Sequence, residues 1–93
     1  MLPAAEADLD EAFSHYIGEG SVAAASALHR EVRRAAGLLP AWPRLGRLAV
    51  GQARVLGLRR FPYNLVYRLD GGEILIVAVA HHSRLPRYWR GRS

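Results

Sequence analysis

The chain has 93 residues, which is enough for one hydrophobic core and too few for two. Hydrophobic residues make up 51% of the sequence and charged residues 23%, a balance typical of a globular domain rather than of a disordered segment. The absence of cysteine excludes disulfides, thiolate catalysis and cysteine-based zinc sites. We therefore expect a single domain over residues 1–93 that needs no cofactor.

Charge is divided unevenly along the chain. Residues 1–29 contain five acidic residues and no arginine, whereas residues 30–93 contain thirteen arginines and three acidic residues. Such a basic half suits nucleic acid, the ribosome or an acidic protein segment as a partner, and charge alone does not choose among them. The acidic N-terminus does not resemble a secretory signal, and the longest apolar run has seven residues, against roughly twenty for a membrane span. The sequence predicts a cytoplasmic protein with no membrane partner.

Two amphipathic helices are predicted before the arginine-rich half. Apolar residues spaced by three and four, with acidic residues between them, predict a helix over residues 4–18, and Pro3 suits its first turn. Ser21 is a suitable N-cap for a second helix over residues 21–37, so the two helices form a hairpin. Prolines and glycines then predict a loop over residues 38–51.

After this loop the hydrophobic pattern becomes strand-like. Strands are predicted over residues 53–58, 63–69 and 74–80, and the two short connections make neighbours antiparallel. The last run is apolar on both faces, which places it at the centre of the sheet, and a basic tail follows over residues 83–93. The predicted fold class is α+β, with a helical hairpin packed on a three- to four-stranded antiparallel sheet.

The middle strand separates two faces of this sheet. Alternation directs Tyr63, Leu65 and Tyr67 toward the helices and puts Asn64 and Arg68 on the opposite face. Because no third helix is predicted, we expect the face with Asn64 and Arg68 to be open to solvent or to a partner.

The histidines and the aromatic residues can each be interpreted as functional or as structural. His81 and His82 follow an apolar strand, so either could be a general base or could simply be solvated or bound to a carbonyl. His15 and His29 lie on the helices without metal-ligand spacing, so no metal site is predicted. Trp89 is expected to pack back on the domain rather than to mark an interface.

The order of these elements, with several local motifs, resembles the RelE/ParE superfamily of toxins. The opening AEADLDEAFSHYI resembles its first helix, PRLGR its next loop, and RRFPYNLVYRLDGGEILIVAVAHHSRLPRYW, from Arg59 to Trp89, has its strand motifs in family order. The resemblance implies the toxin of a type II toxin–antitoxin module, with a cognate antitoxin and either DNA gyrase or the ribosome as partners, and no small-molecule substrate. Family members open with a strand, but only two residues precede Pro3 here, so either the natural start lies upstream or one sheet edge is open.

The resemblance also bears on catalysis. Positions that are basic in the mRNA-cleaving members fall on Val55, Gly57 and Asn64. Arg84 matches the arginine that follows the family's last strand, and Tyr88 lies close to where a catalytic tyrosine is expected. Losing cations that stabilise the transition state favours the gyrase-inhibiting ParE branch over a nuclease. A ribosome-dependent endoribonuclease would use Arg84, Tyr88 and His81, and a third alternative is a non-toxic module that only binds antitoxin. The residues predicted to contact the antitoxin or the target are Asn64, Arg68, Arg84, Arg87 and Arg90.

Overall fold

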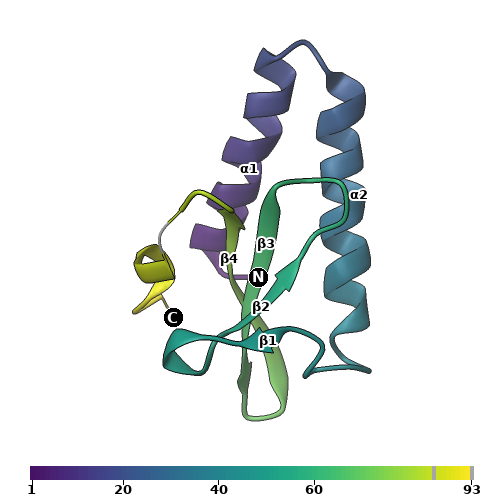
Figure 1. Cartoon of the computed structure of the whole chain (residues 1–93). Helices are drawn as coiled ribbons and strands as arrows, with labels where there is room; N and C mark the ends of the chain where they lie inside the picture. The colour runs from purple at the N-terminus through teal and green to yellow at the C-terminus, as the bar shows by residue number, and fades with distance from the viewer. Residues whose placement is uncertain (85, 93) are drawn as a thin grey trace.

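The computed structural model describes residues 1–84 and 86–92, with only the backbone described at Pro86 and Arg87. Two helices are followed by a four-stranded antiparallel sheet of order β1-β2-β3-β4 (Figure 1). The α+β fold class is confirmed. The elements in chain order are α1 (Pro3–Gly18), α2 (Val22–Leu38), β1 (Arg47–Leu48), the 3₁₀ turn η1 (Val50–Gln52), β2 (Arg54–Gly57), β3 (Tyr63–Asp70), β4 (Glu73–His81) and the 3₁₀ turn η2 (Pro86–Trp89).

The helical hairpin follows from local sequence signals. Pro3 occupies the first turn of α1, where its missing N–H has no intrahelical partner in any case. The Ser21 hydroxyl caps α2 by accepting the backbone N–H of Ala24 at 3.1 Å. Both helices lie within a residue of the predicted ranges. Within residues 1–84 and 86–92, no helix combines the length and the apolar composition needed to cross a membrane.

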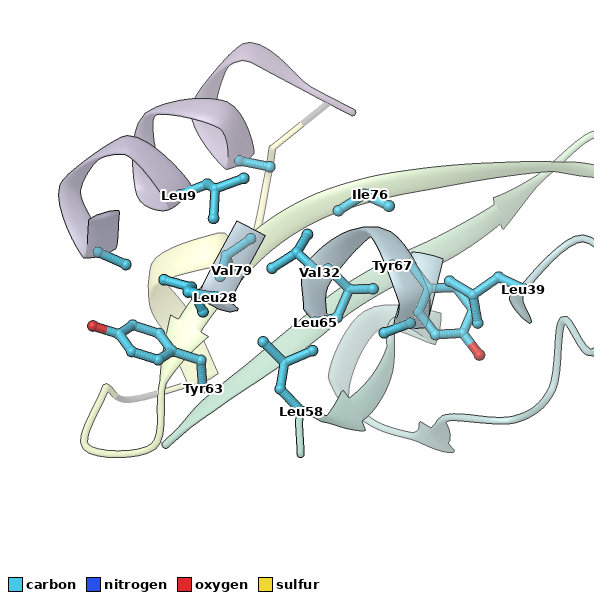
Figure 2. Packing of buried hydrophobic residues seen from close by; sticks show 13 residues of the cluster. Leu9, Leu28, Val32, Leu39, Leu58, Tyr63, Leu65, Tyr67, Ile76 and Val79 are labelled. Carbon is cyan, nitrogen blue, oxygen red and sulfur yellow. The ribbon is translucent and has the colours of Figure 1, made fainter. Parts of the chain in front are cut away.

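The main core lies between the helices and one face of the sheet. Leu9 of α1 and Leu28 and Val32 of α2 point toward Leu65 of β3, and all four side chains are buried (Figure 2). Burying a leucine or valine contributes about 1.5–3 kcal/mol, so this cluster is the chief source of stability. The helix-facing side of the middle strand was predicted correctly.

The opposite face of the sheet is not open, and that prediction is wrong. Trp89 of η2 lies over it with only 8% of its surface exposed, packed against Val55, Val66 and Ala80 among others. An indole ring can cover several small strand residues, so no third helix is needed to bury this face. The expectation that Trp89 packs back on the domain is confirmed.

The position of β4 also differs from the prediction, since it is an edge strand and not the central one. Its residues are apolar on both faces because the helices cover one face and Trp89 covers the other. Alternation reports which faces are covered, but it does not report how many strands flank the element.

The free edge of β4 is nevertheless occupied. The Leu2 N–H donates to the Ile76 carbonyl at 2.9 Å. Side chains fill the next positions, because the Val79 N–H donates to Asp8 at 3.1 Å and Arg92 donates to the Val77 carbonyl at 2.8 Å. These groups stand where a neighbouring strand would make its ladder bonds, so the predicted open edge is wrong for β4.

Strand β1 lies inside the stretch predicted to be a loop. It pairs with β2, Arg47 opposite Val55, and a tyrosine from β3 holds the approach to it. The buried Tyr67 hydroxyl accepts the Gly46 N–H at 2.9 Å and donates to the Pro43 carbonyl at 2.7 Å. Gly46 is required there, because a Cβ would lie 2.9 Å from the Tyr67 ring.

One carboxylate joins α2 to the loop between β2 and β3. Glu31, whose side chain is 10% exposed, accepts two hydrogen bonds from Arg34, at 2.7 and 2.8 Å, and the backbone N–H of Arg59 at 2.6 Å. The hydrogen bonds from Arg34 are the largest influence on Glu31 and lower the pKa of its carboxyl below the ordinary 4.5. Arg60, the next residue in the loop, has a φ of 70°, which costs a non-glycine residue of the order of 1 kcal/mol.

Candidate functional site

A pocket of about 330 Å³ opens between α1, the end of β4 and the segment that follows it. We call it the α1–β4 pocket. All three residues predicted for a nuclease, His81, Arg84 and Tyr88, line it. The full lining is Asp8, Glu11, Ala12, His15, Tyr63, Val79, His81, Ser83, Arg84 and Tyr88.

Asp8 joins the three elements around this pocket. Its carboxylate, on α1, accepts from Arg92 at 2.7 and 3.3 Å and from the Val79 N–H of β4 at 3.1 Å. The ion pair is mostly buried, with 14% of the Asp8 side chain and 19% of the Arg92 side chain exposed. A charge-assisted pair in this setting is stronger than one on the open surface, so it fixes the C-terminal segment against the domain.

Tyr88 contributes an aromatic wall. The guanidinium carbons of Arg84 and Arg92 lie 4.3 and 4.8 Å from the centre of its ring, within the range of cation–π attraction. Its hydroxyl lies 3.3 Å from both Asp8 Oδ2 and the Val79 carbonyl oxygen, and it can donate its single proton to either of them. Burial, reinforced by the negative charge of Asp8, raises the pKa of Tyr88 to about 12. The phenol is therefore neutral near pH 7 and is poorly suited to act as a base.

His81 is held in one orientation at the mouth of the pocket. The backbone N–H of Ser83 donates to His81 Nδ1 at 3.0 Å, and the Ser83 hydroxyl lies 2.8 Å from the same nitrogen. Because an amide N–H can only donate, Nδ1 is the acceptor, and the neutral ring carries its proton on Nε2. The ring can then donate a hydrogen bond from Nε2, while its basic lone pair is already engaged. His82, the other histidine considered as a base, is exposed and outside the pocket lining.

The residues predicted to contact a partner are divided between two places. Arg84 lies in the α1–β4 pocket, whereas Arg68 and Arg90 line a second cavity on the other sheet face. Asn64 lies opposite Gly57 and Ala80 in the sheet and lines neither. The predicted contact of Arg87 lies outside the described side chains.

Sequence reasoning missed the acidic wall of the α1–β4 pocket. Asp8 and Glu11 were assigned only to the polar side of a helix, and His15 was considered only as a metal ligand. These residues are spaced by three and four, so they share one helical face with Ala12. That spacing was the available signal, and an acidic stripe on a helix usually faces solvent.

Comparison with known proteins identifies the family. A family model described as the ParE toxin of the type II toxin–antitoxin system parDE matches residues 1–86. The chain belongs to the ParE toxin family. A solved structure described as the chromosomal ParDE TA system from P. aeruginosa is similar to it, with a TM-score of 0.76 and 28% sequence identity over 86% of this chain and 89% of the other. No curated protein sequence matches the chain.

The sequence resemblance was to the RelE/ParE superfamily as a whole, and the family model places the chain in its ParE branch. The chain is a ParE-type toxin of a type II toxin–antitoxin system, and the family implies an antitoxin partner. The helical hairpin and the antiparallel sheet are thus the scaffold of a toxin.

Proposed function

We propose that this ParE family member inhibits DNA gyrase and is neutralised by a cognate antitoxin. The observation that carries the proposal is the sheet face where the mRNA-cleaving relatives are expected to place their cations. Val55 is buried there beneath Trp89, Gly57 has no side chain, and Asn64 is neutral. Without cations at these three positions, the transition state of RNA cleavage would lack the electrostatic stabilisation that such a mechanism needs.

The contact with the target is assigned to the C-terminal part of the chain. Arg84 and Arg90 are exposed, and both belong to a segment with no acidic residue after Glu73. The pair between Asp8 and Arg92 holds this segment in place, so the exposed Arg84 and Arg90 are presented in a fixed geometry. A fixed set of arginines loses less conformational entropy on binding than a flexible tail would lose.

A second candidate function is the ribosome-dependent endoribonuclease. The convergence of His81, Arg84 and Tyr88 on one pocket favours it. Two features weigh against it, because the high pKa of Tyr88 keeps the phenol neutral and the Nδ1 lone pair of His81 is taken by Ser83. We therefore expect mRNA on translating ribosomes to remain intact when the purified protein is added.

The test uses two variants that change the net charge equally. Arg84→Glu should weaken inhibition of gyrase supercoiling by about tenfold or more, since it reverses a charge at the proposed contact. Arg33→Glu, on the exposed side of α2 and outside the α1–β4 pocket, should leave inhibition nearly unchanged. Equal losses in the two variants would contradict the assigned contact. No inhibition by the wild-type protein, with antitoxin binding retained, would instead indicate the non-toxic binding module.

A further inference from the structure

A small cavity lies on the sheet face opposite the helices, between the β1–β2 connection and the C-terminal turn. In Figure 1 the yellow C-terminal segment folds back beside the teal loop that precedes β2. The cavity measures about 90 Å³ and is lined by Val50, Gly51, Ala53, Arg68, Val77, Trp89, Arg90 and Gly91. We call it the Arg68–Arg90 cavity. Sites for whole small molecules are usually about 300–1,000 Å³, so this one can admit a single chemical group.

The lining is cationic and contains no acidic residue. Arg68 is half-buried on β3 and Arg90 is exposed in the C-terminal turn, and neither forms an ion pair within residues 1–84 and 86–92. By contrast, Arg34 and Arg92 are both bound to carboxylates. Two uncompensated guanidinium groups around one cavity repel each other, and an anion between them would relieve that repulsion.

Trp89 lines the same cavity. Trp89 is 8% exposed, and its indole Nε1 is buried without a hydrogen-bond partner among the described residues. Leaving a buried donor unpaired costs about 1–3 kcal/mol, so such an atom calls for a partner. The indole N–H can only donate, so its proton is a sensitive probe of an anion that binds beside the ring.

The backbone around the cavity keeps its mouth open. Gly51 and Gly91 have φ values of 66° and 81°, which favour glycine, and a Cβ at either position would meet no atom within 4 Å. Glycine at these two positions therefore forms the rim without side chains, and a ligand group can approach the backbone there. A bulge that inserts Val77 into β4 turns that residue to the same face as Arg68 and completes the apolar floor.

We propose that the Arg68–Arg90 cavity binds a phosphate group, with the two guanidinium groups as donors. The donors come from β3 and from the C-terminal turn, and they surround a space that fits one group. Donors in several directions suit a tetrahedral oxyanion better than a planar carboxylate, which is matched by a single arginine fork. The group can be free phosphate or the terminal phosphate of a nucleotide. This site is separate from the α1–β4 pocket and does not depend on gyrase being the target.

The test follows the two indole N–H signals of the full chain by NMR during titration with inorganic phosphate at constant ionic strength. The chain has two tryptophans, and Trp42 is 63% exposed and is not part of this lining, so its signal is an internal control. The Trp89 signal should shift in a saturable manner, while the position of the Trp42 signal should not change. Thymidine 5′-monophosphate should give the same shift and thymidine should give none, whereas thymidine acting alone would identify a base site and overturn the proposal.

Matched variants decide whether the arginines are responsible. Arg68→Gln and Arg90→Gln should each weaken phosphate binding by about tenfold or more, as expected for the loss of a charged donor. Arg33→Gln removes the same charge from α2 and should leave the affinity unchanged. The proposal is overturned if phosphate does not saturate the Trp89 shift, if the three variants behave alike, or if acetate binds as tightly as phosphate.

Discussion

Removing the Asp8 carboxylate is the sharpest perturbation of the fold that the structure offers. Asp8→Ala deletes the acceptor for Arg92, at 2.7 Å, and for the Val79 N–H, at 3.1 Å. A hydrogen bond to a charged group contributes about 1.5–3 kcal/mol, and the edge N–H of β4 adds up to about 1 kcal/mol, because water can partly replace its partner. The expected loss is thus about 2–4 kcal/mol, a large part of the stability of a small domain.

The assay is urea unfolding followed by circular dichroism and by tryptophan fluorescence. Asp10→Ala is the control, because Asp10 is exposed on the same helix and has no hydrogen-bond partner within the described residues, and it should change stability by less than about 0.5 kcal/mol. In Asp8→Ala the emission of Trp89 should also move to longer wavelength as the C-terminal segment loosens. The reasoning is refuted if the two variants are equally stable. A double-mutant cycle with Arg92→Gln should give a coupling of about 1–3 kcal/mol.

Three further predictions concern pH and salt. The folded-state pKa of Glu31 is lowered, so its contribution is present above about pH 4.5 and is lost as the pH falls through the lowered value; Glu31→Gln should flatten this part of an acid-unfolding curve followed by circular dichroism. The pKa of Tyr88 is raised to about 12 from 10, so its contribution is complete below pH 10 and is lost toward pH 12; absorbance at alkaline pH should show a late-titrating tyrosine that Tyr88→Phe removes. Association with an acidic antitoxin segment should slow markedly as salt rises, and a stopped-flow rate that is indifferent to salt would show that charge does not guide the encounter.

The sequence was sufficient where the determining interactions are local. The Ser21 hydroxyl caps α2 by accepting the N–H of Ala24, three positions further along the chain, and the buried face of α2 follows from the spacing of its apolar residues alone. Both signals lie within a few residues of the structure they specify, so the helical hairpin was predicted closely. The three longer strands of the second half were also predicted from local alternation, and no strand end differs from its predicted position by more than one residue.

The errors arise from contacts between distant residues. Strand β1 depends on the hydroxyl of Tyr67, which bonds to Gly46 across 21 positions, and the local sequence there is interrupted by prolines and glycines. The occupied edge of β4 depends on Arg92 and Asp8, which are 84 positions apart. The periodicity of a sequence does not predict a contact between residues so far apart. For the same reason, the acidic wall of the α1–β4 pocket was not predicted.

Family resemblance supplied what periodicity could not. It brought His81, Arg84 and Tyr88 together in the expectation of one site, and the structure places all three around one pocket. It offered nothing on the Arg68–Arg90 cavity, since that cavity forms only when the C-terminal turn folds back over β3.

The most direct test of the central claim is a supercoiling assay with purified DNA gyrase and relaxed plasmid. The account predicts that the wild-type protein blocks supercoiling, that a cognate antitoxin restores it, and that the same preparation leaves mRNA on translating ribosomes uncut. Undiminished supercoiling together with site-specific cleavage of ribosome-bound mRNA, lost on Arg84→Ala, would contradict the account and assign the α1–β4 pocket to a nuclease.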